Sequence, residues 1–290
     1  MSIALDSECF QCHLRRNLET ARKLGSEEQA TAFAKDLMKL YLTAPADASS
    51  PWLAPATSDL FRLHYGVPED RFREEKEISN RFVLERIHKI RERVETAADP
   101  LLAALQFAIL GNYIDFSSLQ GQVSFEQLDS MLDRAGEMTP VGNGLEELRN
   151  DLEKGRKLLY LTDNAGEIGF DRIFAEVIRE QYPDLQITFC VRGGPAMNDA
   201  LRADAELMEI PFPVIDNGNR VAGTQIDQLS VEAKEALEEA DVIIAKGQGN
   251  IETMYGCGYN VYYAFLVKCA RFVRVFGQPK LTPMLVRERA

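Results

Sequence analysis

Four polar segments that contain glycine each follow a short apolar run in the second half of the chain. They are DNAGE at 163–167, RGGPAMND at 192–199, DNG at 216–218 and KGQGN at 246–250. In an open sheet of parallel strands, ligands bind beyond the carboxyl ends of the strands. A single polar loop is ordinary, but four of them at one sheet edge predict a ligand-binding site there.

Three side chains in these segments carry oxygen donors that suit a hard cation. Asp163, Asn164 and Asp199 offer carboxylate and amide oxygens, and the segments contain no cluster of histidines. Mg²⁺ and Mn²⁺ prefer oxygen ligands, whereas catalytic zinc usually takes histidine. The alternative is that Asp163 and Asn198 cap the helices that follow them. Because Asp199 and Lys246 are expected at neighbouring strand ends, a metal site is favoured over helix capping.

The segment KGQGN combines a cation with a flexible backbone. Lys246 supplies the charge, while Gly247 and Gly249 let the N–H groups from Gly247 to Asn250, Gln248 included, turn toward an anion. A helix that starts here adds its dipole. The alternative is a surface turn with a solvated lysine. The two common glycine-rich nucleotide patterns are absent, which disfavours a nucleotide site.

The helical first half offers one further candidate. The segment GNYID at 111–115 interrupts an apolar helix. Asn112 and Asp115 are expected to face the cleft from the helical side, where they would contact the substrate. They are equally typical of residues that end a helix and form the next turn.

The N-terminus carries a C-x-x-C-H string formed by Cys9, Cys12 and His13. Covalent haem attachment uses this string, but it usually follows export and the N-terminus has no signal-peptide pattern. A redox pair, a zinc site completed by Cys257 or Cys269, and two plain reduced thiols at a helix start are the other interpretations. The chain has five cysteines, an odd count that argues against a disulfide framework.

These residues need elements to position them, and the apolar patterns predict an α/β fold. Helical spacing dominates the first half, most clearly at 83–94 and 101–109. From about residue 155, helical segments near 170–178 and 229–240 alternate with short apolar runs, and Ser230 is expected to cap the second of these helices. The predicted strands are 157–162, 187–192, 212–215, 241–245 and 261–267.

Alternating strands and helices imply a mostly parallel sheet. We therefore expect a Rossmann-like three-layer α/β/α sandwich, capped by an N-terminal helical domain. The predicted helical cap domain covers residues 1–150. The predicted α/β domain, which would bind metal and phosphate, covers residues 151–290.

The composition of the chain limits the kinds of molecule that it is expected to bind. The chain has 290 residues, with 33 Lys and Arg against 45 Asp and Glu, and a formal net charge of −12. This charge argues against nucleic acid and anionic membranes as partners. No apolar run is long enough to span a membrane, and no signal peptide is recognisable, so a cytoplasmic location is expected. The sequence does not predict an oligomeric state.

The motifs CFQC, GNYID, LTDNAGE, VRGGPAMND and IAKGQGN, followed by Lys268-Cys269, together resemble the damage-control metal-dependent phosphatases. This family was long called domain of unknown function 89, and the N-terminal C-x-x-C resembles its mostly prokaryotic subgroup. The resemblance covers nearly the whole chain. It implies a helical cap on an α/β/α sandwich and hydrolysis of small phosphate monoesters, such as sugar phosphates or damaged phosphometabolites.

The resemblance also implies a cofactor and site roles. The cofactor would be a divalent cation, magnesium or manganese, with nickel and cobalt as further candidates. The implied metal ligands are Asp163, Asn164 and Asp199. The implied substrate-binding residues are Glu167, Arg192, Lys246 and Lys268.

For the reaction we expect a metal-polarised water as the nucleophile, oriented by Glu167. The alternative nucleophile is Asp163 itself, which is less favoured because a carboxylate bound to a metal is a poorer nucleophile. Lys246 and the backbone of residues 247–250 would neutralise the phosphate.

Two other functions fit part of the sequence. One is an S-adenosylmethionine-dependent carboxylate methyltransferase, an activity also proposed for one branch of the family, which would hold its cofactor near Gly166 and Gly169. No G-x-G-x-G follows the first predicted strand, which disfavours it. The other is a non-catalytic protein that binds a metabolite or a metal.

Overall fold

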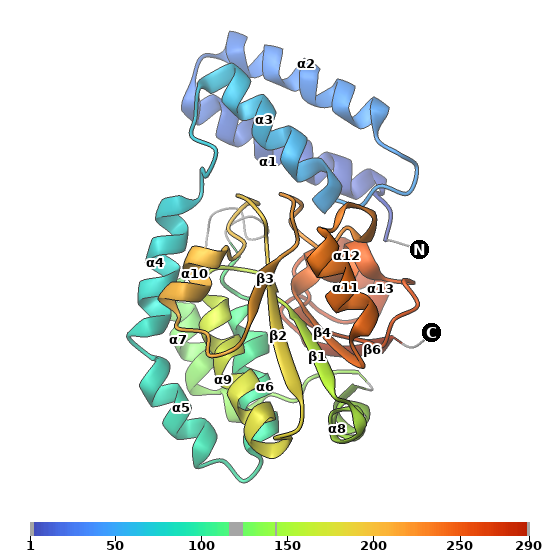
Figure 1. Cartoon of the computed structure of the whole chain (residues 1–290). Coiled ribbons are helices and arrows are strands. Elements are labelled where there is room, and N and C mark those ends of the chain that lie inside the picture. The colour runs from blue at the N-terminus through green and yellow to red at the C-terminus, as the bar shows by residue number, and fades with distance from the viewer. Residues whose placement is uncertain (1–2, 116–123, 143, 289–290) are drawn as a thin grey trace.

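The computed structural model describes residues 3–115, 124–142 and 144–288, and a six-stranded sheet forms its centre (Figure 1). The sheet order is β3-β2-β1-β4-β5-β6. The first five strands run parallel, and β6 is antiparallel to β5. The strands are β1 (Lys157–Leu161), β2 (Gln186–Val191), β3 (Val214–Asp216), β4 (Val242–Lys246), β5 (Val261–Leu266) and β6 (Pro283–Glu288). The predicted α/β fold with a mostly parallel sheet is confirmed.

Helices surround this sheet. Those of the first half are α1 (Ser7–Leu24), α2 (Glu27–Thr43), α3 (Ala54–Tyr65), α4 (Arg73–Leu84), α5 (Ile87–Glu95), α6 (Pro100–Gly111), α7 (Phe125–Asp133) and α8 (Gly144–Lys154). Those of the second half are α9 (Glu167–Gln181), α10 (Arg202–Leu207), α11 (Val231–Glu239), α12 (Gly247–Met254) and α13 (Ala270–Phe276). Short 3-10 helices occur at Pro51–Leu53, Ala135–Glu137 and Ile226–Gln228.

The three layers follow from alternation along the strands. Successive side chains of a strand point to opposite faces. In β1, Leu158 and Tyr160 join an apolar cluster with α5, α6 and α9, whereas Leu159 and Leu161 join a second cluster with α11, α12 and α13. β4 and β5 are buried along their whole lengths, as is typical of strands covered on both faces.

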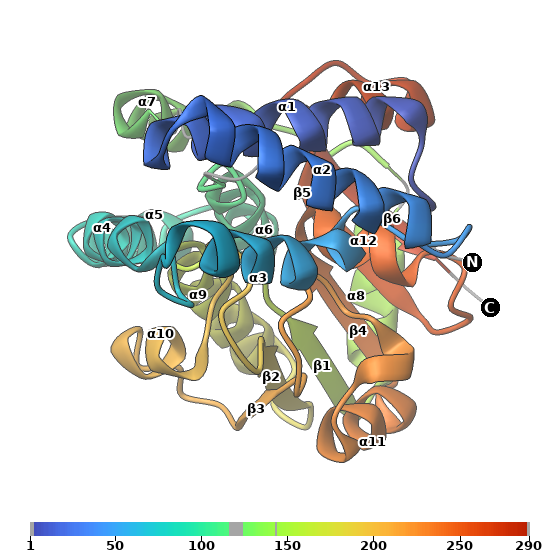
Figure 2. The same cartoon turned by 90° about the horizontal axis from the view of Figure 1, so that it is seen from above.

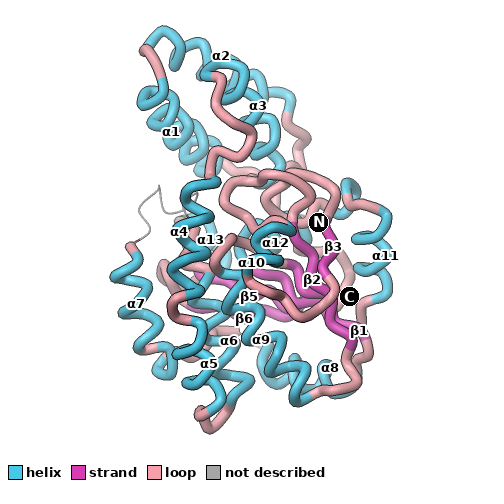
Figure 3. The backbone as a smooth tube through the Cα atoms, turned by 60° about the vertical axis from the view of Figure 1, so that its left-hand side comes forward, coloured by secondary structure: helices cyan, strands magenta, loops and turns pink. Residues whose placement is uncertain are grey.

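The cap over the sheet edge consists of α1, α2 and α3, which have an apolar cluster of their own around Phe33, Leu37 and Phe61. Viewed from above, these helices lie across the top of the molecule (Figure 2), and the loops that follow the strands gather beneath them (Figure 3). Arg220, in the loop after β3, donates from both terminal nitrogens to the carboxylate of Asp59 on α3 at 3.1 Å. The domain boundary at residue 150 stays a prediction.

Three local details differ from or refine the sequence expectations. The segment 83–94 is not one helix, because the chain turns between the end of α4 and the start of α5, and the apolar spacing simply continues across the turn. The edge strand β6 was not predicted, since its apolar residues are few and mixed with Arg287 and Glu288. Ser230 caps α11 as expected, accepting from the backbone N–H of Ala233 at 3.2 Å.

No helix in the described ranges is both long enough and apolar enough to cross a lipid bilayer.

Candidate functional site

The site lies where the sheet order reverses. β1 has β2 on one side and β4 on the other, so the loops that leave β1 and β4 diverge and open a crevice at the carboxyl edge. Asp163 lies two residues past the end of β1, and Gly247 starts α12 directly after β4. An isolated antiparallel bridge between Asn164 and Asp199 brings the loop after β2 to the same place.

Asp163 and Asp199 are both buried in this crevice. The Oδ2 atom of Asp163 accepts hydrogen bonds from the side-chain amides of Asn112 at 2.9 Å and Asn164 at 2.8 Å. The Oδ2 atom of Asp199 accepts from Nε of Arg192 at 2.6 Å. Within the described ranges, the Oδ1 atom of each carboxylate accepts no hydrogen bond, so each keeps one oxygen for a ligand. Nη2 of Arg192 lies 3.8 Å from Oδ1 of Asp163.

The charge on this pair is poorly compensated. Burial raises the pKa of Asp163 well above its usual range, and repulsion from Asp199 and Glu167 adds to the effect. Burial also raises the pKa of Asp199 to about 6, although the guanidinium of Arg192 opposes this. A cation between the two carboxylates would favour their charged forms and lower both pKa values.

Gly247 lets the backbone after β4 approach Asp163. Its φ is +76°, a conformation that side chains rarely adopt. A Cβ atom at this position would lie 1.9 Å from Oδ2 of Asp163, closer than any real contact. The start of α12 is therefore held directly against the carboxylate, as only glycine allows.

Lys246 does not point into the crevice. Its side chain is fully buried, and Nζ donates to Glu167 at 2.7 Å, to Asp171 at 2.7 Å and to the carbonyl of Ala108 at 2.8 Å. Burial by itself lowers the pKa of Lys246, but the two carboxylates outweigh it and raise the pKa to about 12. An ammonium has three N–H groups, so this side chain has no donor left for a phosphate.

Glu167 connects Lys246 with the crevice. Its Oε1 atom accepts from Lys246, and its Oε2 atom accepts from the side chain of Asn164 at 2.6 Å. Asn112 donates to both Glu167 oxygens, at 3.2 and 3.1 Å. The Oδ1 atom of Asn112 accepts from the backbone N–H of Leu266 at 3.1 Å, which fixes α6 to β5. Asn112 thus lies among the strand-end residues, and its expected contact with the substrate stays a prediction.

Arg192 and Asn250 support the crevice from the side of β2 and β4. Besides bonding Asp199, Arg192 donates to Oδ1 of Asn250 at 3.4 Å. The Asn250 amide donates to the carbonyls of Lys246 at 2.6 Å and Thr162 at 3.1 Å. Both side chains thus hold loops together.

Lys268 and Asp115 form a separate pair at the other flank. Nζ of Lys268 donates to Oδ2 of Asp115 at 2.7 Å. The backbone N–H of Lys268 donates to Oε1 of Gln248 at 2.6 Å, which links α12 with the end of β5. The sequence-predicted residues of the helical half and of the last loop are thus brought together here.

A cavity of about 500 Å³ lies between this crevice and the cap. The predicted site residues that line it are Asp115, Asp163, Asn164, Asp199, Gln248 and Gly249. The other predicted site residues do not line it; they are Asn112, Glu167, Arg192, Lys246, Gly247, Asn250 and Lys268. Cap residues complete the lining, among them His13, Arg16, Lys23 and Arg71. The sequence singled out His13 only as part of the C-x-x-C-H string, and it gave no signal for the three cations, which belong to no motif.

The network beneath the cavity has more acids than bases. Its carboxylates are Asp115, Asp163, Glu167, Asp171 and Asp199. Its cations are Arg192, Lys246 and Lys268. Five carboxylates against three cations leave two negative charges, when all are ionised, without a partner inside the network. One divalent cation carries the charge that would balance them.

Amide oxygens complete the donor set. No three His, Cys, Asp or Glu side chains converge on one point in the described part of the chain, so a third ligand must be of another type. The side chain of Asn164 lies beside Asp163, and its Oδ1 atom accepts from Asn198 at 2.9 Å. The Oδ1 atom of Asn198 is buried and accepts no hydrogen bond from any described residue. Two carboxylates with nearby amide oxygens match the ligands of Mg²⁺ and Mn²⁺.

Comparison with known proteins agrees with this architecture. A family model described as "Damage-control phosphatase ARMT1-like domain" matches residues 5–282. The chain belongs to this damage-control phosphatase family. The family resemblance expected from the motifs is confirmed.

Two curated relatives and one solved structure are similar to this damage-control phosphatase family member over much of its length. A damage-control phosphatase of Archaeoglobus fulgidus is 31% identical over 275 residues, covering 93% of this chain and 94% of the relative. A damage-control phosphatase of Pyrococcus horikoshii is 34% identical over 191 residues, covering 64% of each chain. The crystal structure of a DUF89 family protein from Pyrococcus horikoshii has a TM-score of 0.81 and 27% identity, covering 100% of this chain and 99% of that one.

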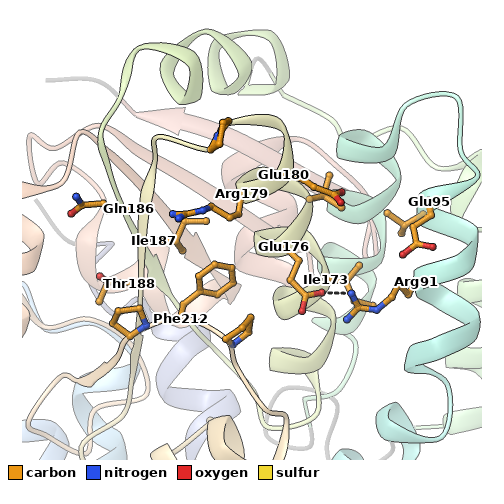
Figure 4. Close-up of a pocket in the computed structure, with 15 residues that line it drawn as sticks. Arg91, Glu95, Ile173, Glu176, Arg179, Glu180, Gln186, Ile187, Thr188 and Phe212 are labelled. Carbon is orange, nitrogen blue, oxygen red and sulfur yellow. Dashed lines mark ion pairs between the residues drawn. The ribbon is translucent and has the colours of Figure 1, made fainter.

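In this family member, a second cavity of about 870 Å³ lies at the amino ends of β2 and β3 (Figure 4). Asp163 and Asp199 lie at the opposite, carboxyl edge of the sheet. We call the second cavity the α5–α9 groove, because Arg91 of α5 and Glu176 of α9 face each other across it. They form an ion pair at 2.6 Å. Glu176 also accepts from Arg172 at 2.9 Å, so its charge is compensated.

The C-x-x-C-H string of this phosphatase family member lies in the cap. Burial raises the pKa of Cys9 to about 11, and its sulfur accepts from Arg271 at 3.3 Å. Nδ1 of His13 is hydrogen-bonded to the hydroxyl of Tyr41 at 2.7 Å. Because no three-residue His, Cys, Asp or Glu cluster exists in the described part of the chain, these contacts do not support a zinc site there.

Proposed function

We propose that this protein is a divalent-metal-dependent phosphatase that hydrolyses phosphate monoesters of small metabolites. The observation that carries the proposal is the surplus of buried negative charge at the carboxyl ends of β1 and β2, directly beneath a cavity. Buried charges are retained in proteins when they are paired or bind metals. Membership of a damage-control phosphatase family supports the reaction class.

Asp163, Asp199 and the amide of Asn164 would hold the cation. When bound, it would polarise a phosphoryl oxygen and lower the pKa of a water molecule, as divalent metals do in such enzymes. Magnesium and manganese are the first candidates, because all three ligands donate oxygen.

Residues behind the lining position these ligands. Glu167 accepts from Asn164 and is itself fixed by Lys246 and Asn112. We therefore assign Glu167 and Lys246 positioning roles, in place of the direct contacts expected from the sequence. Arg192 orients Asp199 through its 2.6 Å hydrogen bond.

The start of α12 would bind the phosphate. Gly249 and Gln248 line the cavity, and α12 begins at Gly247 against Asp163. Backbone N–H groups in the first turn of a helix have no partner within the helix and favour anions. These N–H groups lie beside the carboxylates, so together with the cation they would neutralise the phosphate, which is the main requirement of phosphoryl transfer.

The methyltransferase alternative finds less support. Gly166 and Gly169 were its expected cofactor contacts, but protein fills the space beside both. A Cβ atom on Gly166 would lie 2.9 Å from Ser79, and one on Gly169 would lie 2.7 Å from Val83. The backbone N–H of Gly166 is also taken, donating to Asn80 at 2.7 Å. Isothermal titration with S-adenosylmethionine tests this alternative directly, and we expect no binding heat.

A panel of phosphorylated metabolites tests the proposal. We expect phosphate release with Mg²⁺ or Mn²⁺ and none in EDTA, with activity restored by excess metal. Tight binding of a phosphate ester without any release would instead support the non-catalytic alternative.

A further inference from the structure

The roof of the 500 Å³ cavity carries positive charge that the proposed phosphatase chemistry does not use. Arg16 and Lys23 of α1 and Arg71, in the turn before α4, line the cavity on the cap side. Glu19 and Glu75 belong to the same lining, so three cations face two acids there. The carboxylates and the start of α12 line the opposite side. A phosphate bound at the carboxylates therefore leaves the roof cations to face the rest of the substrate.

Arg71 is held in place without an acidic partner. Its guanidinium lies 3.9 Å from the centre of the Phe61 ring and 5.4 Å from that of Phe72. It forms no hydrogen bond or ion pair with any described residue. Burial lowers the pKa of Arg71 to about 10, with Glu75 opposing. Even so, Arg71 is charged at neutral pH.

Two of the acids near Arg71 in the sequence are engaged elsewhere. Glu69 lies 3.4 Å from Arg220, and Asp70 forms an ion pair with Lys76. Glu75 lines the cavity but forms no ion pair with Arg71 within the described ranges. Arginine is the cation best suited to bind carboxylate and phosphate through paired N–H groups. A desolvated arginine that lines a cavity, with Glu75 near it but no ion pair to any described residue, is thus organised for an anionic ligand.

Arg16 adds a second cation of the same kind. It is half-buried and lines the cavity, and its side chain forms no ion pair with any described residue. Its neighbour Arg15 is exposed, is not part of the cavity lining and pairs with Glu19 at 3.5 Å. Adjacent arginines on α1 thus differ in environment, and only one of them faces the cavity.

We infer that Arg71, assisted by Arg16, forms an anion subsite for a second acidic group of the substrate. The substrate class is then a phosphate ester that carries another oxyanion, either a second phosphate or a carboxylate, at the end remote from the bond that is hydrolysed. This inference rests on the proposed phosphatase function and specifies its substrate.

Matched pairs of substrates test the inference. One pair is glucose 1,6-bisphosphate and glucose 6-phosphate; the other is 3-phosphoglycerate and glycerol 3-phosphate. The measured quantity is the ratio of kcat/KM between the doubly and singly anionic member. We expect a ratio of at least ten for the wild-type protein in one pair, because a charged hydrogen bond contributes about tenfold or more to affinity. The pair that shows it identifies the second group as phosphate or carboxylate.

Substitutions test whether the arginines of the roof cause the difference in kcat/KM between the two members of a pair. Arg71→Met should reduce the ratio at least tenfold, mainly through KM, and Arg71→Lys should restore part of it. The matched control is Arg15→Met, which removes a charge from α1, the helix of Arg16, outside the lining and should leave the ratio within twofold of wild type. A purely structural role for Arg71 would lower the thermal midpoint and affect both members of a pair equally, which would overturn the inference.

A binding experiment separates this inference from the proposed function. Glucose 1,6-bisphosphate and glucose 6-phosphate are titrated into the protein in EDTA, where no hydrolysis is expected. Tighter binding of the bisphosphate by at least tenfold, lost in Arg71→Met, supports the subsite even if no ester is hydrolysed. Equal affinities overturn the subsite, even if phosphatase activity is present.

Discussion

The two cavities differ more in charge compensation than in shape. The α5–α9 groove, at the amino ends of β2 and β3, has the larger volume, about 870 Å³ against about 500 Å³. Its central acid, Glu176, is paired with Arg91 and Arg172. The smaller cavity has buried carboxylates below and unpaired arginines above. Uncompensated charge, and not volume, therefore marks the candidate site, since buried or desolvated charge without a partner is unfavourable unless a ligand supplies one.

The strongest contrast between the two regions should appear in stability. Lys246→Met leaves Glu167 and Asp171 buried without their cation, and breaking such a buried pair destabilises proteins by about 3–5 kcal/mol. Arg91→Met removes a partly exposed partner from the groove, where ion pairs contribute about 0–1 kcal/mol. Urea unfolding followed by circular dichroism measures both. Similar losses of unfolding free energy in the two variants would mean that the ion pairs of Lys246 and Arg91 do not differ in burial as described.

The next largest difference between the carboxylate site and the α5–α9 groove should appear in catalytic activity. Asp163→Asn and Asp199→Asn should each lower kcat by about 10²–10³, the loss typical of removing one group that stabilises the transition state. The thermal midpoint of Asp163→Asn should stay the same or rise, because the change relieves repulsion between buried carboxylates. That of Asp199→Asn should fall, because Arg192 is left buried without its ion-pair partner. Glu176→Gln in the groove is the matched control, and its kcat should stay within twofold. Full EDTA-sensitive activity in both aspartate variants would contradict the site assignment.

Stabilisation by a bound metal gives a third comparison between the two regions. Ligands that bind only the folded state stabilise it by about 2.7 kcal/mol at 100 times Kd. We expect Mn²⁺ to raise the thermal midpoint of the wild-type protein and of Glu176→Gln, and to have little effect on Asp163→Asn. An equal rise in all three proteins would indicate that the metal binds elsewhere.

The smallest expected effect concerns pH. Burial lowers the pKa of His13 in the cap to about 4, from 6.5, with Arg16 contributing. A histidine with a depressed folded pKa stabilises the fold above about pH 6.5 and loses that contribution as the pH falls toward 4. Between pH 7 and 5.5 the stability should fall by about 1 kcal/mol more in the wild type than in His13→Gln. Denaturant titrations at both pH values measure this, and equal losses would mean that His13 is accessible to protons.

The strand-end residues could be predicted because topology makes them meet. Parallel strands deliver their carboxyl ends to one edge, so Asp163, Asn164 and Asp199 converge without any knowledge of side-chain packing. The direction of Lys246 was harder to predict. It is the last residue of β4, and alternation places it on the same face as Ile244, toward α6 and α9. Glu167 and Asp171, one turn apart on α9, were the signal that a cation would point that way.

The roof of the cavity could not be predicted from the sequence. Arg16 and Arg71 lie on separate segments of the first half, and no motif or spacing connects them. Their convergence depends on how α1 and α3 pack against α2 and on where the chain turns before α4. Adjacent residues such as Arg15 and Arg16 cannot be distinguished until the buried face of α1 is known.

The contacts of Asn112 indicate that the crevice forms late in folding. Its side chain bonds Asp163, 51 residues away, and Leu266, 154 residues away. Contacts between such distant segments form after local structure, because closing long loops opposes them until other contacts exist. The crevice is therefore completed only when α6, the loop after β1 and β5 have all docked. A partially folded chain would keep its carboxylates in water, where their mutual repulsion is weak, and would have no assembled site with which to act on phosphate esters.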